Sequence, residues 1–186
     1  MAGNKIVQTI KSPWPANNML RRNEPVATDA IKAQVPAVDD GSAMAQLFIG
    51  QKSLVSDAYG IKTDAAFVNA LEDNMRQRGA MDKLISDGAQ AELSNRAKDI
   101  LRVLCIDDWH SEDHYQHQNF AEHRWRHIKK NVEWLMNTRK CPPEVWLLAL
   151  QYGCSVMNHT AEKSLGNRPP LQVLEGHTID ISTLLF

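Results

Sequence analysis

The sequence predicts an α/β domain built on a central, mixed five-stranded sheet with helices packed on its faces. One observation is that apolar residues recur along the chain first with a period of two, typical of strands, and later with a period near 3.6, typical of helices. The other is the order of the segments: strand, strand, strand, helix, strand, helix, strand, helix, helix. Such an order favours a mixed sheet whose faces are covered by helices.

Composition and length are typical of one globular domain. The chain has 186 residues, of which 43% are hydrophobic and 23% charged. We expect an N-terminal arm over residues 1–24, a core domain over 25–165 and a C-terminal tail over 166–186. The sequence contains neither an apolar run of the roughly 18 residues that span a membrane nor a signal peptide, so we expect an intracellular protein without membrane contact. Its three cysteines lack the spacing of a zinc knuckle or redox pair and are expected to be buried, reduced thiols.

The first three strands are predicted as a meander. The segment from Pro25 to Val35 has the alternating, β-branched character of an extended chain. It is followed over residues 38–42 by an Asp-Asp-Gly-Ser turn with hairpin chemistry. Met44 to Gly50 and Leu54 to Tyr59 are two further strand-like runs, separated by a second turn.

Helices and short strands alternate in the middle of the chain. Thr63 is expected to cap a helix that ends at Gly79. A short strand is expected at residues 83–86. Apolar positions at helical spacing between Ala97 and Leu104 predict a second helix, and we expect the apolar run 104–106 to be the fifth strand.

The last third of the chain is expected to be mostly helical. A polar loop over residues 107–118 precedes a long helix that begins near Asn119. Residues 121–140 contain six basic and two acidic side chains, a local charge of +4 in a chain whose net charge is −1. A mostly buried helix over 144–159 follows, and the tail after Leu165 is expected to be loop-like.

Three acidic residues, Asp29, Asp87 and Glu122, form the acidic trio of this chain. Each has an ordinary explanation: a strand-edge aspartate, a turn aspartate before glycine, and a carboxylate favoured by a helix dipole. Taken together, they would bring carboxylates from two strands and a helix start to one end of a sheet, as two divalent cations about 4 Å apart require. Asp39 and Asp40 are rival first ligands, although the glycine turn that follows explains them.

Cations follow the third acid on the predicted long helix. Arg126 and Lys129 lie four and seven residues after Glu122, on the same helix face, with Lys130 beside them. Such a row could hold a phosphate backbone beside bound metals. The alternative is an ordinary solvated helix face.

Five histidines suggest a second kind of metal site. Their spacings could place some of them on one helix face, and zinc favours imidazole ligands. The alternative is that they belong to a loop and to the basic surface. These residues are His110, His114, His117, His123 and His127.

A series of motifs, in order, resembles the catalytic core of retroviral and retrotransposon integrases, specifically that of copia-type long-terminal-repeat elements. The similarity extends from about Arg21 to Ser182, and the step from the second to the third acid is 35 residues. The most specific stretch is His117-Gln118-Asn119-Phe120-Ala121-Glu122, ahead of the basic helix. The other segments that carry the resemblance are Arg21-Arg22, Thr28-Asp29-Ala30, Ala45 to Ile49, Arg78-Gly79-Ala80, Leu84 to Ala89, Pro142 to Trp146, Asn158 and Pro170 to Gly176.

The resemblance implies a ribonuclease H-like fold and phosphodiester transesterification that joins the 3′ ends of element DNA to target DNA. It implies that the acidic trio holds two Mg²⁺ or Mn²⁺ ions, and that the loop over residues 107–118 closes over the site. A nuclear location and a homodimer or higher oligomer are also implied by the family alone. The residues expected to hold DNA phosphates are Arg126, Lys129 and Lys130.

The chain also departs from the family pattern. Integrases of this kind carry an N-terminal His/Cys zinc domain and a C-terminal DNA-binding region, and this sequence has neither. We therefore expect an isolated core or a remnant of an element. An alternative function is a decayed or host-retained core without catalytic activity that serves as a DNA-binding or assembly module.

Overall fold

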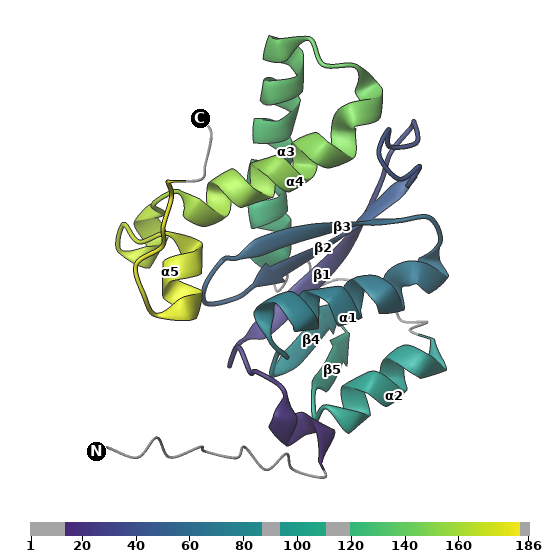
Figure 1. Ribbon diagram of the computed structural model, residues 1–186, viewed down its shortest axis with the longest axis vertical. Helices are drawn as coiled ribbons and strands as arrows, with labels where there is room; N and C mark the ends of the chain where they lie inside the picture. Colours follow the sequence, from purple (N-terminus) through teal and green to yellow (C-terminus); the bar gives the residue numbers. More distant parts are fainter. Residues whose placement is uncertain (1–13, 87–93, 111–119, 183–186) are drawn as a thin grey trace, which may run out of the picture.

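A five-stranded mixed sheet lies between two pairs of helices in the computed structural model, which describes residues 14–86, 94–110 and 120–182 (Figure 1). The strand order is β3-β2-β1-β4-β5. The first three strands form an antiparallel meander, whereas β4 and β5 run parallel to β1, which confirms the predicted mixed sheet. The strands are β1 (Pro25–Lys32), β2 (Met44–Gly50), β3 (Ser56–Ile61), β4 (Lys83–Ser86) and β5 (Asp107–His110).

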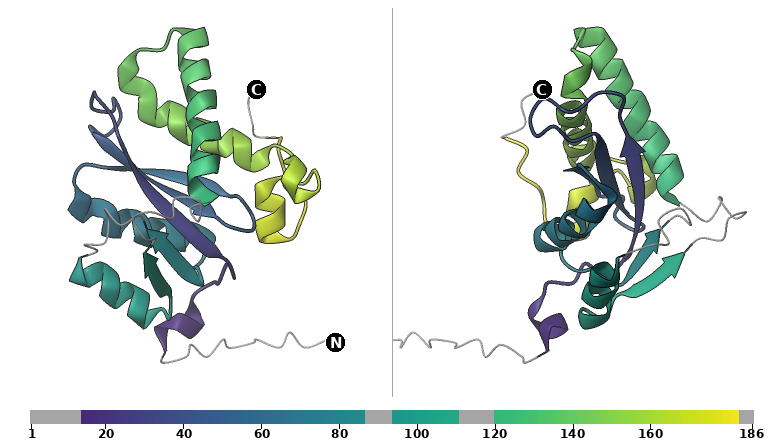
Figure 2. Two further views of the ribbon diagram at one scale, coloured as in Figure 1. Left: turned by 180° about the vertical axis from the view of Figure 1, so that it is seen from behind. Right: turned by 90° about the vertical axis from the view of Figure 1, so that its right-hand side faces the viewer.

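The helices cover both faces of this sheet. α1 and α2 pack on one face, α3 and α4 on the other, and α5 packs against α4 (Figures 1 and 2). No helix in the part of the chain that the structure describes is long and apolar enough to cross a membrane. The helices are α1 (Phe67–Arg78), α2 (Asn95–Val103), α3 (Phe120–Arg139), α4 (Trp146–His159) and α5 (Pro170–Glu175), with 3-10 turns at Pro15–Asn18, Asp64–Ala66, Pro143–Val145 and Lys163–Leu165.

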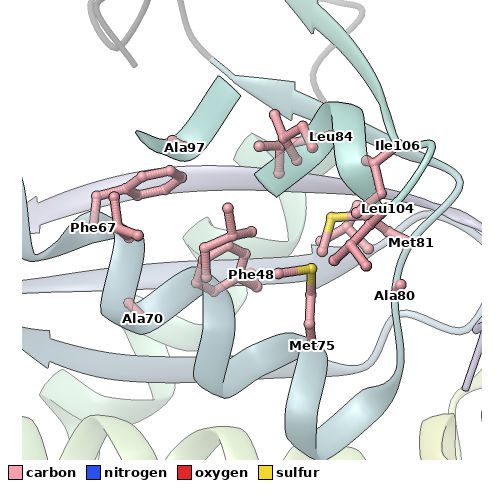
Figure 3. Packing of buried hydrophobic residues seen from close by; sticks show 14 of the residues in the cluster. Phe48, Phe67, Ala70, Met75, Ala80, Met81, Leu84, Ala97, Leu104 and Ile106 are labelled. Carbon is pink, nitrogen blue, oxygen red and sulfur yellow. The ribbon is translucent and has the colours of Figure 1, made fainter. Parts of the chain in front are cut away.

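One hydrophobic core fills the space between the sheet, α1 and α2 (Figure 3). Phe48 of β2 stacks on Phe67 of α1 with ring centres 6.2 Å apart and meets Tyr59 of β3 edge-on at 5.8 Å. Aromatic pairs of this kind contribute about 0.5–1.5 kcal/mol beyond their buried area. Met75 and Leu84 are also fully buried in this cluster, so α1 is fixed against three strands.

A second core lies between the sheet and the pair α3 and α4. Ala27 of β1 and Leu47 of β2 meet Ile128 of α3 and Leu147 of α4, all of them almost completely buried. Successive side chains of a strand point to opposite faces of the sheet. Asp29, two residues after Ala27, therefore lies on the face that α3 and α4 cover.

α4 is fixed to the edge strand β3 by a buried amide. Asn158 Oδ1 accepts a hydrogen bond from the Ser56 amide, and its Nδ2 donates to the Ser56 carbonyl, both at 2.8 Å. At the other end of α4, Trp146 Nε1 donates to the Val35 carbonyl at 3.0 Å. Gly60 of β3 permits the close approach of β3 to α4, because a Cβ at Gly60 would lie 2.7 Å from Cδ2 of Leu147.

The fifth strand lies later in the chain than predicted. We expected it at residues 104–106 and a loop after it, whereas β5 begins at Asp107. Leu104 and Ile106 are buried in the first core, and Cys105 between them has a φ of +52°, so the chain turns there. A polar strand is tolerated at this position because β5 is at the edge of the sheet.

β3 and α1 also begin later than predicted. Leu54 has a φ of +61° and belongs to the turn, so β3 begins at Ser56. Thr63 makes no side-chain capping hydrogen bond and precedes a 3-10 turn, so α1 begins at Phe67. Gly79 follows the end of α1, as predicted, with a φ of +90°.

The segment before β1 and the segment after α4 both contact the rest of the domain. Before β1, Arg22 and Glu24 form a buried ion pair at 2.7 Å, and Glu24 also accepts hydrogen bonds from the Lys52 and Ser53 amides. These contacts fix the last part of the arm expected over residues 1–24. After α4, the tail that we expected to be loop-like contains α5.

The three cysteines differ in exposure. Cys154 is buried on α4, Cys141 is half-buried and Cys105 is exposed, so the prediction of buried thiols is wrong for Cys105. Burial raises the pKa of the Cys154 thiol to about 12. That thiol is therefore protonated, and unreactive as a nucleophile, at neutral pH.

Candidate metal and nucleic-acid site

Asp29 directly follows the last described pair between the central strand β1 and its parallel neighbour β4. Among the described residues, β1 pairs with β4 as far as Thr28 and Ser86, and Asp29 is the next residue of β1. On its other side, Asp29 is in register with Leu47 of β2. This position is neither an edge strand nor a turn. The interpretation of Asp29 as an edge-strand aspartate is therefore wrong.

Asp87 lies outside the described residues. β4 ends at the preceding residue, Ser86, which is buried and in register with Thr28. Ser86, the residue before Asp87, is therefore one register position away from Asp29 of β1.

Glu122 lies in the first turn of α3, as predicted. Its side chain is 52% exposed, and its Oε1 lies 3.1 Å from Nη2 of Arg126, one turn along the helix. Exposed pairs of this kind contribute only about 0.3–0.5 kcal/mol, so a phosphate or a cation can readily replace one partner. α3 contacts β1, so Asp29 and Glu122 belong to two elements that pack against each other (Figure 2).

Asp29 and Glu122 thus lie on two elements, β1 and α3, that contact each other on one face of the sheet. Carboxylate oxygens are the ligands that Mg²⁺ prefers, and Glu122 presents its carboxylate to solvent, so the residue types fit such an ion. Within residues 14–86, 94–110 and 120–182, no three His, Cys, Asp or Glu side chains form a group that could hold a metal. Asp87, and with it the complete acidic trio, lies outside these ranges.

The rival acids have a local role. Asp40 accepts hydrogen bonds from the Ser42 hydroxyl and amide at 2.7 and 2.8 Å, in the turn between β1 and β2. The Ser42 hydroxyl holds the pKa of the Asp40 carboxyl below its ordinary value. Asp39 is exposed in the same turn. The turn therefore explains both residues, as the sequence indicated.

The three predicted phosphate-binding residues are exposed on α3. Arg126 contacts Glu122, and Lys129 Nζ lies 3.9 Å from the Glu133 carboxylate. Lys130 is exposed beside them. Both ion pairs are solvent-exposed and weak, so the cations are available to an anionic ligand.

Arg124 does not belong to this exposed surface, although it was counted in the local charge of +4. Its Nη1 lies 3.0 Å from Oε2 of Glu162, and its side chain is only 7% exposed. Burial lowers the pKa of the guanidinium, and the charge of Glu162 opposes this effect. The helical spacing contained the signal, because Arg124 lies four residues before the buried Ile128.

Comparison with known proteins gives the fold a precedent. Neither a protein-family model nor a curated relative matches the sequence. Among solved structures, the catalytic core domain of BIV integrase matches with a TM-score of 0.62 and 16% identity, over 83% of this chain and 95% of that chain. The chain has the fold of a retroviral integrase catalytic core.

Two further structures share this integrase-core, ribonuclease H-like fold. The HTLV-2 integrase catalytic core domain, in a trimeric form complexed with magnesium, matches with a TM-score of 0.60 and 13% identity, over 82% of this chain and 96% of that one. The simian T-cell lymphotropic virus intasome in complex with PP2A regulatory subunit B56 gamma has a TM-score of 0.67 and 14% identity, over 88% of this chain. The match covers 58% of the intasome chain's own length.

One residue beside the candidate site was missed in the sequence. Trp109 of β5 is in register with Ile85 of β4 and packs against the second core, on the face that carries Asp29. We had expected residues 107–118 to form a loop. An alternation of Asp108, Trp109 and His110 was the available signal, but a four-residue polar strand is too short to be distinguished from a loop.

An apolar hollow of about 550 Å³ lies elsewhere in the fold. It is bounded by Met75 of α1 and by Ile100 and Val103 of α2. α1 and α2 cover the face of the sheet opposite to Asp29. This hollow is therefore separate from Asp29 and Glu122.

Proposed function

We propose that this chain is an integrase-like polynucleotidyl transferase core, in which Asp29, Asp87 and Glu122 hold two Mg²⁺ or Mn²⁺ ions. The observation that carries the proposal is the register of the central strands. β4 ends at Ser86, one residue before Asp87, and its partner Thr28 comes one residue before Asp29. The two aspartates therefore follow paired residues on adjacent parallel strands.

The face of the sheet supplies the second support. Asp29 shares its face with Ala27, on the side covered by α3. α3 contacts β1, and its first turn carries Glu122. One carboxylate on the strand and another on the facing helix would thus lie on either side of a bound cation.

The proposed reaction is phosphodiester transesterification that joins the 3′ ends of element DNA to target DNA. When bound, the two ions would activate water or a 3′ hydroxyl group as the nucleophile and stabilise the leaving oxygen. The protein contributes a fixed position for Asp29, because β1 is hydrogen-bonded on both sides, to β2 and to β4. It also contributes a helix start whose acid is accessible to solvent.

The cations of α3 have a separate task in this proposal. Arg126 would exchange its contact with Glu122 for a DNA phosphate once the carboxylate binds metal. Lys129 and Lys130, one turn further along the helix, would contact the next phosphates of the backbone. The exposed ion pairs cost little to break, which makes this exchange feasible.

The family properties of integrases extend the proposal. The HTLV-2 core is described in dimeric and trimeric forms complexed with magnesium. By the same chemistry, we propose that this chain uses Mg²⁺, binds DNA and forms a homodimer or higher oligomer. Origin in a copia-type element, a nuclear location and a catalytic domain over residues 25–165 belong to the same proposal.

A second candidate is a core without catalytic activity that binds DNA or supports assembly. The exposure of Lys129 and Lys130 on α3 favours it, because these cations are accessible to DNA whether or not the acidic trio binds metal. In this alternative, α3 still presents Lys129 and Lys130 to DNA, but no strand transfer occurs.

A strand-transfer or disintegration assay with labelled DNA and either Mg²⁺ or Mn²⁺ separates the two candidates. The transferase proposal expects metal-dependent product from the wild-type chain and none from Asp87→Asn. Asp39→Asn, which changes an exposed turn aspartate, is the matched control and should keep wild-type activity. Wild-type activity no higher than that of Asp87→Asn, together with intact DNA binding, would instead establish the non-catalytic module.

A further inference from the structure

Two exposed histidines lie side by side on α3. His123 and His127 are four residues apart, so they share one face of the helix. Their ring centres are 4.9 Å apart, and their planes are inclined by 45°. Of the five histidines that the sequence suggested as metal ligands, these two are brought together; His114 and His117 lie outside the described residues.

We propose that His123 and His127 form a chelating site for a divalent transition-metal ion such as Zn²⁺. A tetrahedral zinc with Zn–N bonds of about 2.0–2.1 Å holds the centres of two coordinated imidazole rings about 5 Å apart. The observed separation of 4.9 Å is close to that value, so the spacing of the two rings suits a shared ion. Histidines at i and i+4 on a helix are also the pair that binds zinc in the His-Glu-x-x-His helices of metalloproteases.

The surroundings define a site with open coordination positions. No third His, Cys, Asp or Glu joins the pair among the residues that the structure describes. Glu122 precedes His123, but its carboxylate contacts Arg126. Lys130, three residues after His127, adds positive charge and weakens cation binding. The bound ion therefore keeps positions for water or for an oxygen ligand from outside the chain.

This site differs in chemistry from the proposed carboxylate site. Imidazole nitrogens favour Zn²⁺, Ni²⁺ and Cu²⁺, whereas carboxylates favour Mg²⁺ and Mn²⁺. The two sites should therefore respond to different ions and different substitutions. Zinc binding at the histidine pair does not require that the chain transfer DNA strands.

Isothermal titration of the full chain with Zn²⁺, followed by thermal unfolding, tests the site. The wild-type chain should bind one more Zn²⁺ ion than the double variant His123→Asn/His127→Asn. At a free Zn²⁺ concentration ten times Kd, this extra ion should raise the Tm by about 3–6 °C. Either single variant should lose this ion, because chelation needs both rings. The matched controls His177→Asn and Asp29→Asn should keep it.

Circular dichroism should show that the double variant folds normally, since both rings are exposed on the helix surface. The proposal is overturned if the double variant binds as many Zn²⁺ ions as wild type with the same affinity. It is also overturned if either single variant keeps wild-type affinity, because the two rings would then not act as a pair. Loss of strand transfer in Asp29→Asn without loss of Zn²⁺ binding would show that the two sites are distinct.

Discussion

Nη1 of Arg124 lies 3.0 Å from Oε2 of Glu162, which joins the start of α3 to the segment after α4. Arg124 Nε also approaches the Ser56 hydroxyl of β3 at 3.5 Å, whereas its buried Nη2 has no hydrogen-bond partner among the described residues. Because Glu122 is two residues before Arg124 on the same helix, this anchor fixes the rotation of the turn that carries the proposed metal ligand. Arg124 thus anchors the first turns of α3 to the rest of the domain.

Glu162→Gln should destabilise the fold by about 1–3 kcal/mol. It removes the counter-charge of a buried guanidinium, and breaking a buried ion pair is costly because one charge stays uncompensated. This destabilisation is smaller than the roughly 3–5 kcal/mol that breaking a fully buried ion pair costs, because the Glu162 side chain is 35% exposed. Urea unfolding measures the change. Glu133→Gln, which breaks only the exposed contact with Lys129, should change stability by less than about 0.5 kcal/mol. Equal effects of the two variants would contradict the anchoring role.

Asp29→Asn should abolish metal-dependent strand transfer while the fold stays intact. The amide keeps the shape of the side chain but not the charge that holds a divalent cation. We expect a loss greater than the roughly 10–100-fold that removal of an outer-shell partner of a metal ligand costs. Product formation with Mg²⁺ is the measurement, with Asp39→Asn as control. Substantial residual activity in Asp29→Asn would mean that another residue provides the first ligand.

Lys129→Ala/Lys130→Ala should weaken DNA binding uniformly across sequences and reduce its dependence on salt. Each lysine–phosphate contact contributes about −0.9 to the slope of log K against log salt, so the slope should become less negative by up to about 2. Fluorescence anisotropy with duplex DNA at several salt concentrations measures it. Lys98→Ala, on α2 and exposed, is the control. An unchanged slope in the double variant would remove α3 from the DNA-binding surface.

Stability should fall as the pH rises above about 9, in part because of Cys154. Burial raises the pKa of its thiol to about 12, whereas a thiol in an unfolded chain has a pKa of about 8.5. Between these values the unfolded chain loses a proton that the folded chain keeps, so stability that is fully present below about pH 8.5 is lost at up to about 1.4 kcal/mol per pH unit.

Urea unfolding at pH 8, 9 and 10 checks this expectation. Cys154→Ala should show a shallower decline than wild type, whereas Cys105→Ala, at an exposed thiol, should decline as wild type does. Burial also raises the pKa of Tyr59, which adds a loss in the same direction at higher pH, so the comparison is made at or below pH 10. Identical declines in Cys154→Ala and wild type would exclude a buried thiol.

Hydrophobic periodicity predicted best those elements whose apolar pattern extends over many residues. The meander of β1 to β3 and the helices α3 and α4 were found within a few residues of where they were expected, since their apolar residues recur over many positions. The edge strand β5 was predicted a few residues too early, because four residues paired on one side only carry almost no pattern. Local turns at Leu54 and Cys105, both with positive φ, determine where β3 and β5 begin. Hydrophobic periodicity gives no signal for such turns.

The candidate site was predictable in its residue types but not in its contacts. The sequence indicated Asp29 and Glu122, yet the face on which Asp29 lies follows only from the register of β1 against the buried Ala27. The burial of Arg124 depends on Glu162, 38 residues later in the chain, which is a tertiary contact. Long-range pairing of charges leaves no periodic signal in the sequence.

The most direct test is a crystal structure of the chain soaked in Mn²⁺, whose anomalous scattering locates the ion. The account predicts Mn²⁺ bound by carboxylate oxygens of Asp29 and Asp87 at about 2.2 Å, with Glu122 as a third ligand once released from Arg126. Mn²⁺ that binds elsewhere while Asp29 has no ligand role, or no ordered Mn²⁺ at any concentration that supports strand transfer, would contradict it.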